Sequence, residues 1–242
     1  RHDGAADGVV RMTPAALSHL MATTWPPARI RRFGSVTLRD GAGGGQRVSA
    51  ASVGDGFTDD DLEKAEAAMA SPLFLVHEGQ DALDSALARR GYRPHDPVLA
   101  YAADIDLLTR DLPPLTAFPH WPPLQIACSI WDDAGIGAAR ISVMERVEGP
   151  KTVILARSND RPAGVAFAAV SGTDAMLHAL EVRPACRRNG VGRASLHAAA
   201  NWAASQGATR MAVVVTEGNA AARALYAALG MTVVGQYHYR QT

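Results

Sequence analysis

The sequence predicts an α/β protein made of two tandem domains, the first a degenerate copy of the second. Strand-like and helix-like runs alternate along the second half, and a glycine-rich loop joins one such strand to the helix that follows. The chain also matches itself at a constant offset, which carries part of the first half onto the second. Such alternation is typical of sheets whose strands are connected by covering helices.

The first half contains a turn and a helix start that resemble functional motifs only superficially. Residues 41–45 are glycine-rich, but no amphipathic helix follows them and residues 46–50 have the pattern of a strand. We therefore predict a flexible hairpin turn there rather than a phosphate loop. Asp59, Asp60 and Asp61 precede an apolar helical run, which indicates an N-cap and an acidic first turn rather than a metal cluster.

The internal match consists of a strand, a Glu-Gly turn, a helix that ends at glycine, and a second strand. A constant offset places residues 74–80 on residues 213–219 without a gap and carries Gly91 onto Gly230. The first occurrence ends with a strand at residues 92–104. The match predicts that the two halves are copies of one fold.

A proline-rich segment lies between the two copies. Residues 109–123 contain five prolines, which are typical of a connecting segment. We therefore predict a first domain at residues 1–110, a linker at residues 111–123 and a second domain at residues 124–242.

The glycine-rich loop lies between a strand-like run at residues 175–182 and a helix-like run at residues 190–206. The first turn of a helix has unbonded backbone N–H groups and a positive dipole end, and glycines there allow a pyrophosphate to approach closely. Arg187, Arg188 and Arg193 add positive charge. The loop therefore predicts a phosphate-binding site.

Two common phosphate motifs do not fit this loop. A Walker loop is excluded because no Gly-Lys-Ser/Thr follows, and a dinucleotide fingerprint fails because Ser195 stands where a third Gly or Ala belongs. A Gly-x-Gly alone is equally consistent with a plain turn before a helix, so the neighbouring elements must decide.

The elements after this helix continue the alternation. Residues 211–216 form a short apolar run that suits a buried parallel strand, and Asn219 is placed to cap a helix at residues 220–229. Gly230 follows as the C′ residue, and an alternating strand is expected at residues 231–239.

The pattern Arg187-x-x-Gly190-x-Gly192 between a strand and an amphipathic helix resembles the acetyl-coenzyme A loop of the GNAT superfamily of N-acetyltransferases. The family's second signature, Asn before a helix with Leu-Tyr and then Gly-Phe, matches Asn219, Leu225, Tyr226, Gly230 and Met231, with Met replacing Phe. The resemblance implies two GNAT-like domains, each a twisted mixed sheet flanked by helices. It also implies direct transfer of an acetyl group from acetyl-coenzyme A to a primary amine, without a metal.

The first copy lacks these signatures. At the same offset, residues 187–192 fall on residues 48–53, which contain neither glycine nor arginine, and Tyr226 falls on Leu87. We therefore expect the first copy not to bind coenzyme A.

The resemblance assigns the acetyl-coenzyme A contacts to the end of a strand, the loop and the later helix. The candidates are Leu180, Val182, Arg187, Arg188, Asn189, Gly190, Val191, Gly192, Arg193, Asn219 and Tyr226. A backbone N–H near Glu181 and Val182 would bind the developing oxyanion. Simple helix capping explains Asn219 as well as a contact with the coenzyme does.

The resemblance makes Tyr226 the candidate general acid for the departing thiolate, with a packing role as the alternative. Glu181 and His178 are the candidate general bases, and either is equally an ordinary strand residue. They are three residues apart in a strand, so we expect their side chains on opposite faces of the sheet. Met176 stands where some family members carry a catalytic glutamate, which leaves the base open.

The acceptor is expected to be a small-molecule or peptide amine. The resemblance places its site at residues 124–147, a range that includes Trp131, Asp132, Asp133 and Arg140. The two acids beside the tryptophan either recognise an amine or cap a helix that begins near Ala134.

Composition disfavours several other classes of protein. Basic and acidic residues number 24 each, so no net charge favours nucleic acid or a membrane surface. Cys128 and Cys186 are too few for a disulfide framework and lack metal-binding spacing, which favours the cytoplasm. No run approaches the roughly 20 apolar residues of a membrane span. A homodimer is one option that the sequence allows.

Two other function classes stay open at this point. One is a non-catalytic protein that binds coenzyme A or acts as a scaffold, against which Tyr226 argues. The other is a nucleotide-binding protein that uses the loop for a different phosphate, which the missing Walker lysine disfavours.

Overall fold

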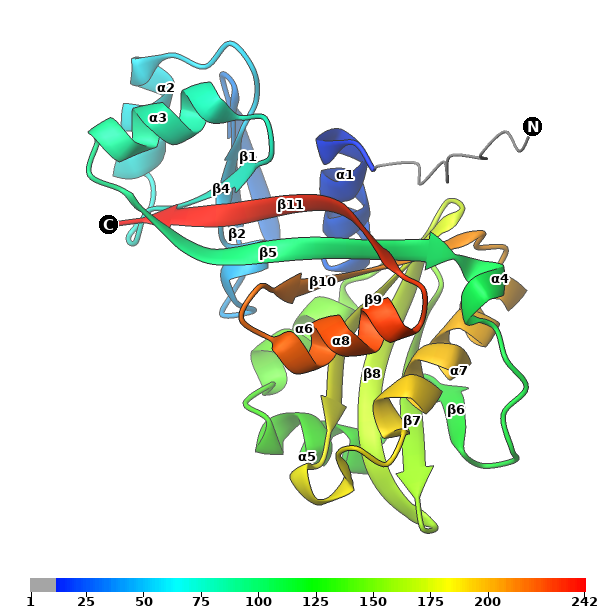
Figure 1. Ribbon diagram of the computed structural model, residues 1–242. Coiled ribbons are helices and arrows are strands. Elements are labelled where there is room, and N and C mark those ends of the chain that lie inside the picture. The colour runs from blue at the N-terminus through cyan, green and yellow to red at the C-terminus, as the bar shows by residue number, and fades with distance from the viewer. Residues whose placement is uncertain (1–11) are drawn as a thin grey trace, which may run out of the picture.

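The computed structural model describes residues 12–242, which form one mixed sheet of 11 strands with helices on both faces (Figure 1). The strands are β1 (Arg29–Phe33), β2 (Val36–Asp40), β3 (Ala51–Val53), β4 (Leu73–His77), β5 (Arg93–Asp104), β6 (Ala117–His120), β7 (Lys151–Ser158), β8 (Arg161–Ser171), β9 (Asp174–Val182), β10 (Arg210–Thr216) and β11 (Thr232–Gln241). The helices are α1 (Pro14–Thr24), α2 (Asp59–Ala67), α3 (Asp81–Arg89), α4 (Ile105–Leu108), α5 (Gln125–Asp133), α6 (Ala138–Glu145), α7 (Val191–Ser205) and α8 (Ala220–Ala228). The predicted α/β class, a mixed sheet flanked by helices, is confirmed.

Alternate strand residues face two helical layers, because side chains of a strand point to opposite faces of the sheet in turn. In β4, Phe74 packs with α2 and α3, whereas Leu75 packs under α1. In β10, Val213 packs with α7 and α8, whereas Ala212 packs under α1. α5 and α6 form a further cluster beside α1, so α1, α5 and α6 cover one face and the other long helices cover the opposite face.

The strand order is β1-β2-β3-β4-β11-β5-β10-β9-β8-β7-β6, and it includes an exchange between the two halves. The two matching units are β4-α3-β5 in the first half and β10-α8-β11 in the second. β4 pairs with β11 and β10 pairs with β5, both antiparallel, so the last strand of each unit pairs with the first strand of the other. Figure 1 shows β5 and β11 side by side between the two ends of the sheet. One sheet per domain was expected, but the exchange joins both halves into a single sheet.

The register of the exchanged strands follows the internal match. His77 lies opposite Tyr237 and Thr216 lies opposite Val98. The same constant offset that defines the internal match relates His77 to Thr216 and Val98 to Tyr237. The preceding strands also correspond, because β1-β2-β3 and β7-β8-β9 are antiparallel and are followed by the parallel pairs β3-β4 and β9-β10.

The proline-rich segment contributes an edge strand, since β6 pairs antiparallel with β7. The same segment is tied to α7. The Arg110 backbone N–H donates to Asn201 Oδ1 at 3.1 Å, and Asn201 Nδ2 donates to the Arg110 carbonyl at 2.7 Å. Residues 117–120 therefore belong to the sheet.

The glycine-rich stretch of the first half forms a turn between β2 and β3. Ala42, Gly43 and Gly45 have positive φ angles of 47°, 79° and 100°. The strand predicted at residues 46–50 is wrong, because residues 46–48 form a 3-10 turn in which the Ala50 N–H donates to the Gln46 carbonyl at 2.8 Å. The strand begins only at Ala51.

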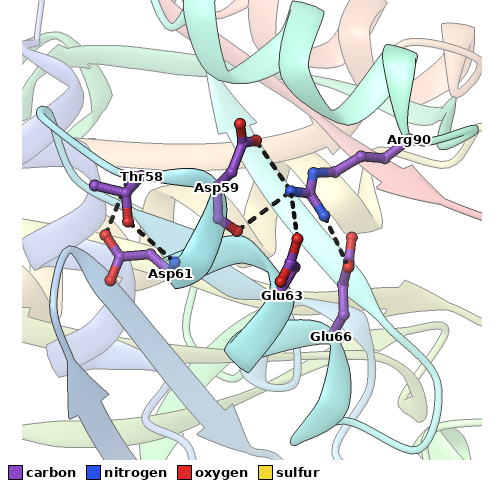
Figure 2. A network of polar contacts seen from close by, with 6 residues as sticks. All are labelled: Thr58, Asp59, Asp61, Glu63, Glu66 and Arg90. Atoms are coloured by element: carbon purple, nitrogen blue, oxygen red, sulfur yellow. Dashed lines mark hydrogen bonds and ion pairs between the residues drawn. The ribbon is translucent and has the colours of Figure 1, made fainter.

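The acidic run forms the first turn of α2, as predicted, with Thr58 as the N-cap. The Thr58 hydroxyl accepts from the Asp61 N–H at 3.2 Å, and the Asp61 carboxylate accepts from the Thr58 N–H at 3.0 Å. Figure 2 shows Arg90 reaching the acids of this helix from the end of α3. Its ion pairs with Asp59, Glu63 and Glu66 measure 3.0, 3.8 and 3.1 Å.

Candidate active site

The glycine loop forms the start of α7. Gly190 caps the helix with a left-handed φ of 77°, which glycine adopts without strain. The first backbone N–H groups of α7 have no acceptor within the helix, and in the described chain no well-formed backbone hydrogen bond outside the helices and strands has its donor at residues 188–193. These groups lie at the positive end of the helix dipole and can therefore bind an anion.

A groove of about 800 Å³ lies beside this loop. It is lined by the end of β9, the loop and one side of α8: Leu180, Glu181, Val182, Cys186, Arg187, Arg188, Gly190, Val191, Gly192, Arg193, Asn219, Ala221, Ala222, Ala224, Leu225 and Ala228. The structure thus brings together the predicted coenzyme contacts except Asn189 and Tyr226, which do not line the groove.

Sequence reasoning missed the α8 side of the groove. Ala221, Ala224, Leu225 and Ala228 repeat at the spacing of one helical face, a pattern that usually indicates core packing. A Cβ added at Gly192 would lie 3.2 Å from Leu225 Cδ2, so glycine allows α7 and α8 to approach closely at this point.

β9 and β10 separate next to the groove. Their parallel pairing ends at Leu177 and Val213, although both strands continue. On its other edge β9 contains a bulge at Ala179, whose φ is +49°. The Trp131 indole N–H donates to the Ala179 carbonyl at 2.8 Å and holds the bulge from α5.

The bulge places His178 and Glu181 on the same face of the sheet. His178 lies opposite Phe167 and Glu181 lies opposite Val165, and residues directly opposite in an antiparallel pair share a face. Phe167 and Val165 are two apart and therefore share a face themselves. The expectation of opposite faces is wrong, because the extra residue at Ala179 shifts the alternation.

His178 is buried and fully engaged. Its Nδ1 lies 3.0 Å from Arg47 Nη1 and its Nε2 lies 3.0 Å from Thr24 Oγ1, while its ring stacks on Trp25 at 4.9 Å. A guanidinium only donates, so Nδ1 accepts and Nε2 carries the hydrogen. Burial and the Arg47 charge hold the pKa of His178 well below its usual value. This imidazole is neutral and has no free lone pair.

Glu181 and Tyr226 interact electrostatically near the gap. Burial raises the pKa of the half-buried Glu181, while the charges of Arg187 and Arg140 oppose that rise. Burial, and then the charge of Glu181, raises the pKa of Tyr226 to about 12. The Tyr226 ring packs against Tyr101, and its hydroxyl makes no hydrogen bond to another described residue. Tyr226 is therefore protonated at neutral pH and free to donate.

A second pocket, of about 480 Å³, lies on the other side of the gap. It is lined by both halves of the chain: Trp25, Gly44, Gly45, Gln46, Arg47, Asp96, Val98, Ile136, Arg140, His178, Ala179, Val214, Val215, Thr216, Tyr237 and Tyr239. The groove and this pocket therefore approach the same separated strand ends from different directions.

Other candidates have structural roles in this arrangement. Asn219 caps α8, because its Oδ1 accepts from the Ala222 N–H at 3.1 Å. Met176 is fully buried. Trp131 is buried too, and Asp132 is exposed in the last turn of α5, so no helix begins near Ala134 for these acids to cap.

Among residues 12–242, no three His, Cys, Asp or Glu side chains are grouped to hold a metal ion. In the same range, no helix combines the length and the apolar character needed to cross a membrane.

Comparison with known proteins identifies one family. The family model described as "Acetyltransferase (GNAT) family" matches residues 112–231. Aminoglycoside N(6')-acetyltransferase type 1 from Klebsiella aerogenes is 31% identical over 127 residues, covering 47% of this chain and 83% of that relative.

Solved structures share the fold at low sequence identity. A GCN5-related N-acetyltransferase from Kribbella flavida superposes with a TM-score of 0.72 at 18% identity, covering 98% of this chain and 96% of that one. A tandem GNAT protein from the clavulanic acid biosynthesis pathway superposes with a TM-score of 0.62 at 16% identity, covering 96% and 88%. Together with the sequence matches, these findings show that the chain belongs to the GNAT acetyltransferase family.

Proposed function

We propose that this chain transfers an acetyl group from acetyl-coenzyme A directly to a primary amine. The main support is that the groove and the second pocket are lined by adjoining residues of β9, beside the gap between β9 and β10. A thioester entering from the groove and an amine entering from the pocket would meet beside Glu181. The family uses acetyl-coenzyme A, and the Klebsiella aerogenes relative is by name an aminoglycoside N-acetyltransferase.

The loop at the start of α7 would hold the pyrophosphate of the coenzyme. Its unbonded N–H groups point to an anion site, and Arg187, Arg188 and Arg193 line the same groove. Asn219 and the α8 alanines would contact the pantetheine arm. When bound, acetyl-coenzyme A supplies the thioester.

The Val182 backbone N–H is our candidate for the oxyanion contact. The neighbouring Arg183 N–H donates to the Ala163 carbonyl of β8 at 2.9 Å. Successive N–H groups of a strand point to alternate sides, so the Val182 N–H points away from β8 and toward the gap. The Leu180 N–H, two residues earlier, shares that direction.

Glu181 and Tyr226 divide the proton transfers in this proposal. Glu181, acting directly or through a water, takes the proton that the amine loses as its nitrogen bonds to the acetyl carbon. Tyr226 gives a proton to the sulfur as the carbon–sulfur bond breaks. His178 is the less favoured base, because Arg47 occupies the lone pair of its Nδ1.

We further propose a tandem GNAT organisation with a degenerate first copy, and domains at residues 1–110 and 124–242 joined through residues 111–123. The corresponding strand pairings and the constant offset between the two copies support it. α2 occupies the place of α7 in the first half, yet its first turn carries three aspartates instead of glycines and arginines. That negative charge would repel a pyrophosphate.

Two measurements test this function. Calorimetry should show one acetyl-coenzyme A site per chain, and a panel of primary amines should release thiol in the presence of the protein. Gly192→Glu should abolish coenzyme binding, because a bulky anionic side chain would fill the groove against Leu225. Gly54→Glu is the matched control, because a Cβ there meets only an ordinary contact at 3.5 Å.

Each alternative has a distinct outcome. Tight coenzyme binding without transfer to any amine would favour the non-catalytic coenzyme A-binding protein. Two equivalent sites per chain would contradict the degenerate first copy.

A further inference from the structure

We propose that the acceptor amine carries an acidic group, a carboxylate or a phosphate, which Arg47 and Arg140 bind in the second pocket. This inference rests on the proposed function, which places the acceptor in that pocket. It names a substrate class different from the polycationic aminoglycosides.

Neither arginine forms a direct ion pair with a described residue, although the charge of Arg140 acts on Glu181 of the neighbouring groove. Arg47 donates to the neutral ring of His178, its Nε is buried without an acceptor, and it forms no ion pair with a described residue. The Arg140 side chain makes neither a hydrogen bond nor an ion pair with any residue in the described range. Guanidinium groups lining a pocket without carboxylate partners favour an anionic ligand, because a planar fork matches carboxylate and phosphate geometry.

The rest of the lining does not cancel this charge. Asp96 is the one carboxylate among the lining residues, and it lies 3.1 Å from His95 Nε2. His178 is neutral, and burial raises the pKa of Tyr239 well above its usual value, so its phenol is uncharged. The described pocket therefore carries an excess of positive charge.

The glycine-rich turn of the first half positions this charge against α6. Added Cβ atoms at Gly43 and Gly44 would lie 3.3 Å from Ala139 and 2.5 Å from Val143, so glycines allow the turn to pack on the helix. At Gly45, with φ of 100°, a Cβ would lie 3.5 Å from the Arg140 guanidinium. The turn thus brings Arg47 to the same pocket as Arg140, and the first half supplies part of the acceptor site.

The positive lining also suits the chemistry. It attracts an acidic group, repels additional ammonium groups and lowers the pKa of the reacting ammonium, which must lose a proton before attack. A pocket of about 480 Å³ fits a small metabolite.

The first test compares amines that differ only in their acidic group. The full-length protein is given acetyl-coenzyme A with ω-amino acids of increasing length, O-phosphoethanolamine, the matching alkylamines and amino amides, and kanamycin. We expect kcat/KM to be at least about tenfold higher for an acidic amine than for its neutral match. Equal rates for acidic and neutral amines, or a preference for kanamycin, would overturn the proposal and leave the transferase function intact.

The second test removes each arginine separately. Arg47→Gln and Arg140→Gln should each lower kcat/KM for the acidic amine by about 10- to 100-fold more than for its neutral match. The comparison between the two amines is needed because Arg140 also acts on the pKa of Glu181, which affects both. Arg32→Gln is the control. It removes the positive charge of an exposed β1 residue that does not line the pocket. Both variants must keep the wild-type unfolding temperature and acetyl-coenzyme A affinity. A uniform loss for both amines would contradict charge recognition.

A binding measurement separates this inference from the proposed function. Calorimetry with the N-acetylated ω-amino acids and their neutral amides, in the presence of coenzyme A, requires no catalysis. Binding of the acids alone, lost in Arg140→Gln, would support the inference even if no amine were acetylated. Equal binding of acids and amides would overturn it.

Discussion

Glu181 and Tyr226 are the base and the acid of the proposed mechanism, and burial raises the pKa of both groups. The pKa of Glu181 is raised by burial, yet two arginines oppose the rise, and the pKa of Tyr226 is raised to about 12. The proposed mechanism requires a deprotonated Glu181 and a protonated Tyr226, and the two groups interact electrostatically near the gap between β9 and β10. Replacing Tyr226 and replacing Glu181 should therefore change the kinetics of acetyl transfer in different ways.

Tyr226→Phe should slow transfer far more than it weakens coenzyme binding. The substitution keeps the buried ring against Tyr101 but removes the donor, so kcat should fall by about 10²–10⁴-fold while the Kd for acetyl-coenzyme A stays nearly unchanged. Steady-state kinetics and calorimetry measure the two quantities. Tyr92→Phe is the control, because Tyr92 is also buried with a pKa raised to about 12 but lies in the first half. A wild-type rate in Tyr226→Phe would make Tyr226 a packing residue.

Glu181→Gln should remove the acidic limb of the pH profile. Activity requires the deprotonated carboxylate, so kcat/KM of the wild type should rise with pH through a pKa above the ordinary glutamate value of 4.5. The variant should be about 10²–10⁴-fold slower and lack this limb. Glu148→Gln, at an exposed position between α6 and β7, should keep the wild-type profile. If Glu181→Gln kept the acidic limb of the pH profile, another group would have to be the general base.

At this scale the loop residues could be predicted and the bulge could not. Gly190 and Gly192 are recognisable as the start of a helix, because they stand between a strand-like run and an amphipathic run. Ala179 adopts a positive φ although nothing in the sequence indicates a bulge there. The bulge places His178 and Glu181 on the same face of the sheet, whereas opposite faces were expected. The arginine contact that occupies His178 comes from residue 47, which no local pattern connects to β9.

At the level of elements, β11 contacts the first half through ion pairs as well as through its pairing with β4 and β5. Asp84 on α3 accepts from Arg240 Nε and Nη2 at 2.8 and 2.7 Å and from His238 Nε2 at 2.7 Å. Arg240 Nη1 also donates to the Tyr92 carbonyl at 2.8 Å. Hydrogen bonds from Arg240 and His238 lower the pKa of Asp84.

Asp84→Asn should destabilise the protein by about 1–3 kcal/mol at neutral pH, because it leaves a mostly buried guanidinium without its carboxylate. Asp84 has a folded pKa below its ordinary value of 3.8, so its stabilisation is complete above that value and is lost as pH falls through the folded pKa. The difference in unfolding free energy from wild type should therefore shrink under acid conditions. Urea unfolding at several pH values measures it. Asp60→Asn, in an exposed i, i+4 pair, should have little effect. A pH-independent difference would argue against the ion pair.

Most single elements were predictable, whereas the exchange of β5 and β11 was not. α7 and α8 begin within a residue of the expected positions, because Gly190 and Asn219 are recognisable caps. The two strand–helix–strand units have similar local patterns, so the sequence does not distinguish pairing within a unit from pairing between units. The strand expected at residues 46–50 failed because the glycine turn continues into a 3-10 turn.

Across the whole molecule, each half completes the other. β11 has both of its neighbours, β4 and β5, in the first half, and β10 has β5 on one edge. The turn that carries Arg47 lines a pocket with α6 and β9. The first half therefore has a structural role in the second, because it supplies strand partners for β10 and β11 and part of the pocket lining.

This arrangement predicts that the halves fold together and not separately. Residues 111–242 expressed alone would leave β11 without either strand partner and would expose one edge of β10, so this fragment should lack cooperative unfolding and tend to aggregate. Mixing it with residues 1–110 during refolding should restore acetyl-coenzyme A binding. Cleavage of the intact protein within residues 109–123 should likewise leave the two pieces associated. Circular dichroism, size-exclusion chromatography and calorimetry measure these outcomes. A stable monomeric fragment 111–242 that binds acetyl-coenzyme A like the full chain would show that the exchanged strands are dispensable for folding.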